Sequence, residues 1–374
     1  MTMWLIILYM TLVMTGAGLL YLSSRIDRFS PFKKLKKGKF SFGTLFVLSL
    51  FVFLGWILNF VNAIVCVICV SMIWGISDLL FFLFEKKRGV RFKRYYAGAT
   101  ALAASLVYLS FGWEQAHHVR QTAYTVVTNK KAAEMKIVMF ADSHIGTTFD
   151  VEGFSKHIAV MQAQNPDMVI VAGDFIDDNK SRGEMTAACR ALGAMKTTYG
   201  VYFVLGNHDY GYYGPVHRGF SVQELEAELE KNGVVVLRDE AVSIADTFYL
   251  IGRKDYSVEK ERGGKRASMK ELVQNLDQSK YMIVADHQPA DYKNQVEANV
   301  DLVVSGHTHG GQLFPFNQIG KWIGATDKIY GHEKRNQTDF IVTSGLSDWA
   351  IKFKTGCQSE FVTVNIKSAV NKSE

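Results

Sequence analysis

The segment KIVMFADSH, residues 136–144, decides the fold of this chain. Its apolar, β-branched run is typical of a strand buried on both faces, and Asp142 and His144 follow where that strand ends. Four further segments repeat the arrangement: MVIVAGD at 168–174, VYFVLGNHD at 201–209, YMIVADH at 281–287 and LVVSGHTH at 302–309. The sequence therefore predicts an α/β sheet whose strand ends present Asp, Asn and His side chains along one edge.

The surrounding sequence from residue 135 onward alternates short apolar runs with helical stretches. Further strands are expected at 234–237, 248–251, 340–343 and 361–366, and helices at 153–165, 222–231 and 290–298. This alternation predicts an α/β domain over residues 135–367, followed by a polar tail at 368–374. Residues 114–134 are expected to form a polar linker that precedes the domain.

The first 113 residues have a different composition. They hold 13 of the chain's 42 Lys and Arg residues but only three of its 36 acids, Asp27, Asp78 and Glu85, a net charge of +10. The rest of the chain holds the other 29 basic and 33 acidic residues, a net charge of −4. The overall charge of +6 thus comes from the N-terminal region. It gives no support to nucleic-acid binding.

Apolar runs in this region predict a transmembrane unit with four spans, at about 3–22, 40–59, 62–84 and 95–113. As one helix, the apolar stretch 40–84 would be about 68 Å long, about twice the thickness of the hydrocarbon core, so two crossings are expected. No basic residue precedes the first run, which favours an uncleaved anchor over a signal peptide. Asp78 is expected to reach the membrane interface beside Lys86 and Lys87; a functional intramembrane carboxylate is the alternative.

Basic residues between the runs predict how the spans are oriented. Residues 25–39 carry seven Lys and Arg, and residues 86–94 carry six, so the positive-inside rule places both loops in the cytoplasm. Four crossings then place the C-terminal domain outside the cytoplasm. We expect a multi-pass protein of the cell membrane, with the lipid bilayer as a partner.

The residue types at the five strand ends predict a metal site. A single Asp-x-His or Gly-Asp is common and usually a cap or a turn, but Gly-Asn-His-Asp at 206–209 and Gly-His-Thr-His at 306–309 are rarer. Imidazole, carboxylate and amide donors without a thiolate suit Mn, Fe or Zn. Two such cations about 3.5–4 Å apart can bind both the attacking and the leaving oxygen when a phosphoryl group is transferred. They can also generate a bridging hydroxide that attacks phosphorus.

In order and spacing, these motifs resemble those of the calcineurin-like metallophosphoesterases, and the predicted anchor resembles that of the membrane-bound bacterial branch. The resemblance covers roughly residues 135–366. It implies a four-layer sandwich of two mixed β-sheets flanked by helices, with a dinuclear metal site at one edge.

The resemblance also implies a role for each motif residue. The first metal ion would be bound by Asp142, His144 and His309 and the second by Asn207, His287 and His307, with Asp174 bridging the two. His208 would contact the phosphate and protonate the leaving oxygen, and Asp209 would favour the charged form of His208. Ser344-Gly345-Leu346 is followed by Ser347-Asp348 and then by Lys352 and Lys354, in a region where members of the family often have a further glycine and an arginine.

Two features outside the motifs have competing interpretations. Arg253 follows an apolar run and could bind a substrate phosphate through two hydrogen bonds, whereas a surface ion pair with Asp255 or another acid is equally compatible with its position. The segment 310–330 contains several large apolar side chains that could form a lip touching lipid. We expect most of them to pack on their own domain instead.

The leading hypothesis is a membrane-anchored phosphoester hydrolase that uses two metal ions on the non-cytoplasmic side. A catalytic domain tethered about 20 residues from a bilayer would meet head groups at high effective concentration, which favours a lipid or lipid-linked phosphate as substrate. Hydrolysis of soluble extracellular nucleotides or sugar phosphates is the alternative. A non-catalytic metal- or lipid-binding sensor ranks lower because no ligand is missing. A transporter also ranks lower because the spans carry few ionisable residues.

Overall fold

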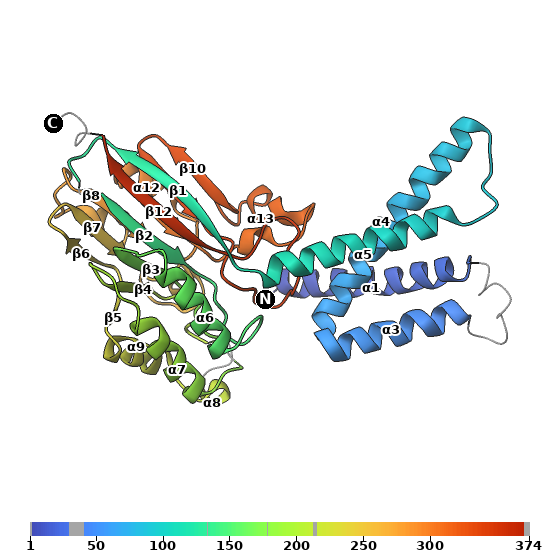
Figure 1. Ribbon diagram of the computed structural model, residues 1–374, viewed down its shortest axis with the longest axis horizontal. Helices are drawn as coiled ribbons and strands as arrows, with labels where there is room; N and C mark the ends of the chain where they lie inside the picture. Colours follow the sequence, from blue (N-terminus) through green and yellow to red (C-terminus); the bar gives the residue numbers. More distant parts are fainter. Residues whose placement is uncertain (1, 30–40, 133, 178, 212–214, 370–374) are drawn as a thin grey trace. The chain divides into compact units, whose positions relative to one another are not determined.

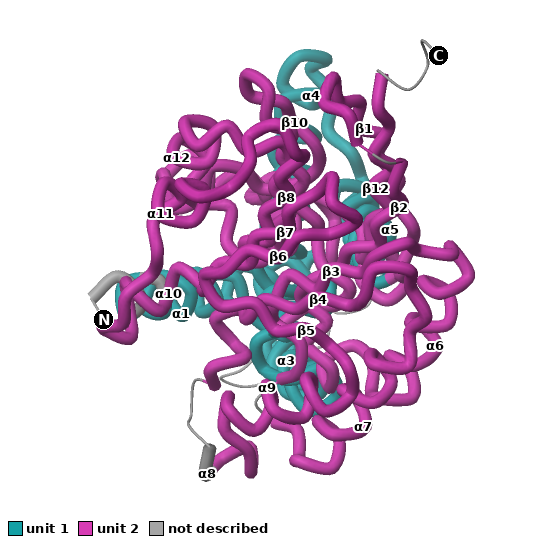
Figure 2. The backbone as a smooth tube through the Cα atoms, turned by 90° about the vertical axis from the view of Figure 1, so that its left-hand side faces the viewer, with its two compact units in different colours: residues 1–113, 350–353 teal, residues 114–349, 354–374 magenta. Residues whose placement is uncertain are grey.

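The computed structural model describes residues 2–29, 41–132, 134–177, 179–211 and 215–369, and the chain divides into two compact units. Unit 1 comprises Met1–Trp113 together with Ala350–Phe353, and unit 2 comprises Glu114–Trp349 together with Lys354–Glu374 (Figure 2). The main division therefore follows Trp113, where the composition of the sequence also changes. Each unit has its own hydrophobic core.

The described part of unit 1 is built from long helices that coincide with the apolar runs (Figure 1). They are α1 (Thr2–Ile26), α3 (Phe42–Leu58), α4 (Phe60–Arg88) and α5 (Tyr96–His117). Asn59 separates α3 from α4 with a φ of 85°, and its side chain accepts a hydrogen bond from the Asn62 amide at 3.0 Å. The helices meet around a small core that includes Leu22, Val67 and Trp74.

The outer surfaces of these helices are apolar. Leu20, Trp56 and Leu106 are 73%, 81% and 69% exposed, the reverse of a water-soluble bundle. Among the described helices, length and hydropathy together identify one, α4, that could cross a membrane, and α3 is apolar but has only 17 residues. Residues 30–40, which hold much of the first basic loop, lie outside the described residues.

Unit 2 contains two mixed sheets, as the family resemblance implied, and each has six strands. The first has the order β1 (Arg120–Thr128), β12 (Glu360–Ser368), β2 (Met135–Phe140), β3 (Met168–Ala172), β4 (Val201–Val204) and β5 (Val234–Val236). The second has the order β10 (Gly331–Arg335), β11 (Thr338–Val342), β9 (Leu302–Ser305), β8 (Tyr281–Ala285), β7 (Phe248–Gly252) and β6 (Glu240–Ile244). Strands β2 to β5 are parallel to one another, and so are β11, β9, β8 and β7.

Alternate residues along each strand face opposite layers, which explains the continuous apolar runs. On β2, Val138 and Phe140 pack toward the helices on one side, and Ile137 and Met139 pack toward the second sheet. The helices of the first side are α6 (Val151–Gln162), α7 (Arg182–Gly193), the short α8 (Pro215–Arg218) and α9 (Val222–Lys231). On the second sheet lie α11 (Met269–Val273) and α12 (Tyr292–Glu297), and α10 (Ser257–Lys260) follows β7 (Figure 2). The two sheets are therefore packed face to face and flanked by helices.

The expected linker is the main local difference from the sequence prediction. Residues 114–134 are not a simple tether, because α5 continues to His117 and β1 occupies Arg120–Thr128. Strand β1 lies at a sheet edge, where its outer face is exposed, so its sequence RQTAYTVVT lacks the apolar run of a central strand. The edge strands β6 and β10 were missed for the same reason.

The prediction for the segment 310–330 is wrong. Five of its large apolar side chains are exposed rather than packed on their domain: Phe314, Phe316, Ile319, Trp322 and Ile323. Trp322 is 73% exposed and Ile323 is 68% exposed. These residues lie on and around η2 (Phe316–Gln318) and α13 (Ile319–Trp322), single turns that contribute no fully buried residue.

Candidate metal centre

The strand ends bring the predicted ligands together from both sheets. Asp142 follows β2, Asp174 follows β3 and Asn207 follows β4, whereas His287 follows β8 and His307 follows β9. Five of the seven predicted ligands have positive φ angles: Asp142 at 50°, His144 at 33°, Asp174 at 55°, His307 at 71° and His309 at 48°. Such angles are uncommon for residues other than glycine, and they concentrate at functional sites.

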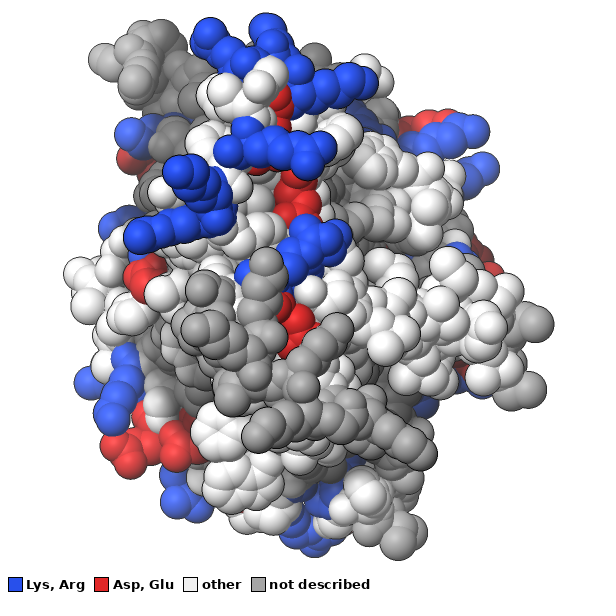
Figure 3. All heavy atoms as spheres, turned by 90° about the vertical axis from the view of Figure 1, so that its right-hand side faces the viewer, with Lys and Arg blue, Asp and Glu red and all other residues white. Residues whose placement is uncertain are grey.

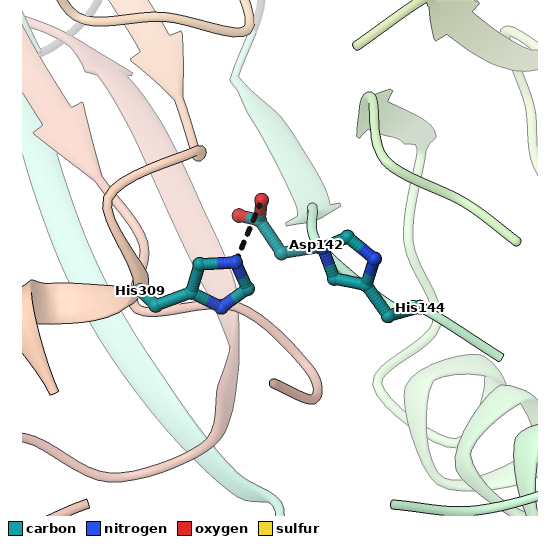
Figure 4. A group of neighbouring side chains, drawn as sticks. All are labelled: Asp142, His144 and His309. Carbon is teal, nitrogen blue, oxygen red and sulfur yellow. Dashed lines mark ion pairs between the residues drawn. The ribbon is translucent and has the colours of Figure 1, made fainter. Parts of the chain in front are cut away.

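Asp142, His144 and His309 form the first ligand cluster. One ligand atom from each residue lies within 4.8 Å of the others. In Figure 4 the imidazole of His309 faces the carboxylate of Asp142, and its Nε2 is 3.7 Å from Asp142 Oδ1. The amide of His307 donates to both Asp142 oxygens, at 3.1 and 2.8 Å, which fixes the orientation of this carboxylate.

Asp174, His287 and His307 form the second cluster, again with ligand atoms within 4.8 Å of one another. Asp174 Oδ2 lies 3.2 Å from His287 Nε2 and 3.7 Å from His144 Nε2, so this carboxylate stands between the two clusters. His287 Nδ1 is 2.7 Å from the Ala172 carbonyl oxygen, which turns Nε2 toward the site. Asn207 Oδ1 lies 3.1 Å from that Nε2. The structure thus gathers all seven predicted ligands.

The donor set fits two divalent cations. His144 is fully buried, and neither of its ring nitrogens has a hydrogen-bond partner among the described residues. Burial lowers the pKa of His144 to about 3 and that of His307 to about 4, so both rings are neutral at pH 7, the form that binds a metal. Burial also raises the pKa of Asp142 to about 7, a cost that an adjacent cation would offset.

His208 lies in the same site, beside two residues that the sequence motifs did not reveal. Its ring centroid is 4.7 Å from that of His144 and 5.1 Å from that of Trp349. Asp177 also groups with His144 and His208, with ligand atoms within 4.8 Å of one another. Asp177 follows Asp174 by three residues, a spacing that could have marked it, whereas nothing in the local sequence marks Trp349.

Asp209 contacts the backbone on both sides of the Asp174 strand end. Its carboxylate accepts backbone hydrogen bonds from Asp174 at 2.9 Å, Phe175 at 2.9 Å and Gly206 at 2.8 Å. Burial and the neighbouring charge of Asp174 raise the pKa of Asp209 to about 7. These contacts make Asp209 a positioning residue for the segment that carries Asp174, and its influence on the charge of His208 stays a prediction.

The buried carboxylate of Asp348 lies next to the His309 ring, on its Nδ1 side. Asp348 Oδ1 lies 3.7 Å from His309 Nδ1 and accepts a hydrogen bond from Gln312 Nε2 at 3.0 Å. Lys354 is fully buried, and its Nζ lies 3.3 Å from Asp348 Oδ1. The same Nζ donates a hydrogen bond to the Ser344 carbonyl oxygen at 2.8 Å. The residues that depart from the usual family pattern therefore form one network next to a predicted metal ligand.

Arg253 is placed in a buried ion-pair network and not in contact with the ligand clusters. It is 2% exposed, and its Nη1 donates to Asp286 at 3.0 Å and to Asp291 at 2.7 Å. Asp286 directly precedes the ligand His287 and also pairs with Arg266. Since these carboxylates occupy its guanidinium, the suggested role in binding substrate phosphate is replaced by one in positioning the β8 strand end.

Replacing Arg253 with Met should destabilise the protein by about 3–5 kcal/mol, because it removes one of the two cations that pair with buried Asp286 and also the cation that pairs with Asp291. The measurement is denaturant unfolding of the full chain in detergent, followed by tryptophan fluorescence. Replacing Arg238 with Met is the matched control. Arg238 pairs with Glu226 and Glu230 at a partly exposed site, so the expected cost is below about 1 kcal/mol. Equal destabilisation by the two changes would contradict this interpretation.

Comparison with known proteins agrees with this geometry. The family model described as calcineurin-like phosphoesterase matches residues 135–311, which include the seven predicted ligands. An uncharacterized metallophosphoesterase of Aquifex aeolicus is 35% identical over 204 residues, which cover 54% of this chain and 73% of that protein.

Two other relatives are longer than the matched region. The uncharacterized metallophosphoesterase Cj0846 of Campylobacter jejuni is 30% identical over 236 residues, covering 63% of this chain and 59% of that protein. A protein of Danio rerio named "Transmembrane protein with metallophosphoesterase domain" is 29% identical over 245 residues, covering 63% of this chain and 54% of that protein. The chain thus spans between about half and three fifths of the length of these two relatives.

Proposed function

This chain belongs to the calcineurin-like metallophosphoesterase family, and we propose that it is a membrane-anchored phosphoester hydrolase that works with two divalent metal ions. One observation carries the proposal: two ligand clusters from distant strand ends meet at Asp174, which belongs to the second cluster and lies 3.7 Å from His144 of the first. Imidazole, carboxylate and amide donors suit Mn, Fe or Zn.

The residues around the clusters can be assigned to steps of hydrolysis. Two bound cations would neutralise the substrate phosphate and activate a water molecule for attack. The amide of His208 donates to Asp174 Oδ1 at 2.8 Å, which holds His208 beside the bridging carboxylate. From there the imidazole of His208 donates a proton to the leaving oxygen. The exposed ring of Trp349 lies on one side of His208 and would limit the approach of water and substrate.

We propose that unit 1 anchors the enzyme in the cell membrane through four spans, with unit 2 on the non-cytoplasmic side. The support is the length and hydropathy of α4, the apolar outer surfaces of the other helices, and the relatives named as transmembrane proteins. The two basic loops place their shared side in the cytoplasm by the positive-inside rule.

Labelling of introduced cysteines in intact cells tests this orientation. A membrane-impermeant maleimide should modify Lys270→Cys, on the exposed face of α11, and should leave Lys87→Cys unmodified until the cells are opened. The native cysteines at 66, 69 and 189 are buried, and a Cys357→Ser background removes the partly exposed one. Labelling of Lys87→Cys but not of Lys270→Cys in intact cells would contradict the proposal and indicate the opposite orientation.

We further propose that the substrate is a lipid or a lipid-linked phosphate. The exposed apolar segment 314–323 supports this proposal, because exposed side chains such as Trp322 and Ile323 favour the interface of a membrane or a lipid. Such a segment has no evident use for an enzyme whose substrates are soluble nucleotides or sugar phosphates.

Phosphate release from lipid and soluble phosphoesters, compared in one preparation, tests the substrate class. The double change Trp322→Ser and Ile323→Ser should lower turnover of lipid phosphates in vesicles about tenfold and leave turnover of p-nitrophenyl phosphate unchanged. The exposed residue Val160 on α6 offers a matched control, Val160→Ser. Equal rates on lipid substrates before and after the double change would count against the lipid proposal, and turnover restricted to soluble phosphates would favour the alternative.

A further inference from the structure

Unit 1 contains a cavity of about 620 Å³ that the hydrolytic function does not use. It is formed where the C-terminal ends of α1 and α4 meet the N-terminal end of α5. Among the described residues, the basic ones that line it are Arg25, Arg28, Lys93 and Arg94, and we call it the basic cavity. Figure 3 shows Lys and Arg side chains gathered around a few acidic ones on the face toward which these helix ends point.

The floor of the basic cavity is a fixed polar network around Asp78. This carboxylate accepts hydrogen bonds from Tyr21 at 2.9 Å and Tyr95 at 2.7 Å, and Arg25 Nε lies 2.6 Å from it. Trp74 Nε1 in turn donates to the Tyr95 hydroxyl at 2.8 Å. Asp78 is therefore not an isolated charge: its carboxylate links α1 and α4 to Tyr95, the residue before α5, and lies in the same cavity as Lys93 and Arg94 of the second basic loop.

The charge that remains in the basic cavity is positive. Arg25 and Asp78 neutralise each other, which leaves Arg28, Lys93 and Arg94 against the single carboxylate of Glu85. Glu85 is itself engaged, since it accepts a hydrogen bond from the Phe92 amide at 2.7 Å. The side chains of Arg28, Lys93 and Arg94 are exposed at the rim, so an excess of two positive charges is available to an anion.

The walls of the basic cavity are aromatic. Phe92 packs against Phe81 and Tyr96, with ring centroids 5.8 and 5.5 Å apart. Arg28 lies over the ring of Tyr95 at 5.5 Å. Phe82, which also lines the cavity, is 57% exposed on the apolar surface of α4. A ligand with an anionic head and an apolar tail could therefore place its head among the basic residues and its tail along α4.

We infer that the basic cavity binds the head group of an anionic phospholipid, with the phosphate among Arg28, Lys93 and Arg94. Arginine and lysine bind phosphate oxygens through charge-assisted hydrogen bonds, and basic pockets between membrane helices suit anionic head groups. This inference concerns a site in unit 1 and goes beyond the proposed hydrolysis in unit 2. An anionic phospholipid and a free phosphate ion both present a phosphate group to these residues. The experiment must therefore distinguish the lipid from the free ion.

Lipid retention by the full chain tests the inference. The purified protein is exchanged into nanodiscs made of equal parts phosphatidylglycerol and phosphatidylcholine, released into mild detergent, and analysed by native mass spectrometry. We expect phosphatidylglycerol to be retained over phosphatidylcholine by about tenfold. The double change Arg28→Gln and Arg94→Gln should reduce this preference to near unity.

The matched control is Lys87→Gln with Arg88→Gln, which removes the same charge from the same end of α4 but does not alter the lining of the basic cavity. It should retain the preference of the unchanged protein. Loss of the preference in both double variants would overturn the inference, because it would reflect net charge alone. Inorganic phosphate that binds the unchanged protein while no lipid is retained would overturn the assignment to a lipid. Turnover of p-nitrophenyl phosphate by each variant shows that unit 2 is folded.

Discussion

Replacing Asp174 with Asn is expected to lower phosphoester hydrolysis by at least about a thousandfold and to reduce the bound metal below two ions per chain. Asparagine preserves the volume of the side chain and an oxygen that can accept the hydrogen bond from the His208 amide. It removes the negative charge that stands between the two ligand clusters, so the repulsion between two cations would no longer be offset. Metal analysis and a phosphate-release assay on the same sample measure both effects.

The exposed residue Asp246 provides the control for this prediction. Replacing Asp246 with Asn makes the same chemical change at a turn between β6 and β7, at a φ of 55° that asparagine accepts readily. Metal content and hydrolysis should stay at the level of the unchanged protein. Full activity of the Asp174→Asn variant with two bound metals would show that this carboxylate does not bridge a catalytic pair.

Replacing His208 with Gln should leave two metals bound and lower kcat by about 10²–10⁴-fold. The reason is that, in the proposed mechanism, His208 would donate a proton to the leaving oxygen, and it is not among the predicted ligands. The defect should depend on the substrate: it should be large for alkyl phosphates and small for p-nitrophenyl phosphate, whose leaving group needs little protonation. The comparison of kcat across these leaving groups separates proton donation from a loss of folding.

His118, which is exposed, offers a matched change to Gln that should leave kcat unchanged for every substrate. An equal loss for alkyl and p-nitrophenyl phosphates would assign His208 to binding or to structure. Loss of one metal ion from the His208→Gln variant would instead make it a ligand, which its grouping with His144 and Asp177 allows.

The central strands of the fold could be predicted from the sequence because both their faces are buried. The runs at 168–172 and 281–285 agree with β3 and β8 residue for residue. Strand β1 could not be predicted in this way, since it lies at an edge and half of its side chains are exposed. Helix α7 was missed although Ser181 and Glu184 form a capping box at its start, a signal that the sequence did contain.

The predicted ligands could be found because catalysis restricts their residue types and places them at strand ends. What the sequence did not reveal is which hydrogen-bond and ion-pair partners the surrounding residues have. The carboxylate of Asp209 is occupied by backbone amides, and Arg253 by Asp286 and Asp291. Such pairings join residues far apart along the chain, so no local pattern records them. The positive φ angles at five ligands depend on the same tertiary constraints.

The most direct test of the account is the location of metal ions in crystals of the full chain. Anomalous diffraction recorded at the Mn, Fe and Zn absorption edges identifies both the positions and the elements. We predict two adjacent peaks: one beside Asp142, His144 and His309, and another beside Asn207, His287 and His307, with Asp174 between them. The crystals are incubated with each metal before measurement. The proposed dinuclear centre would be contradicted by a single peak, by a pair of peaks elsewhere or by no peak at these residues.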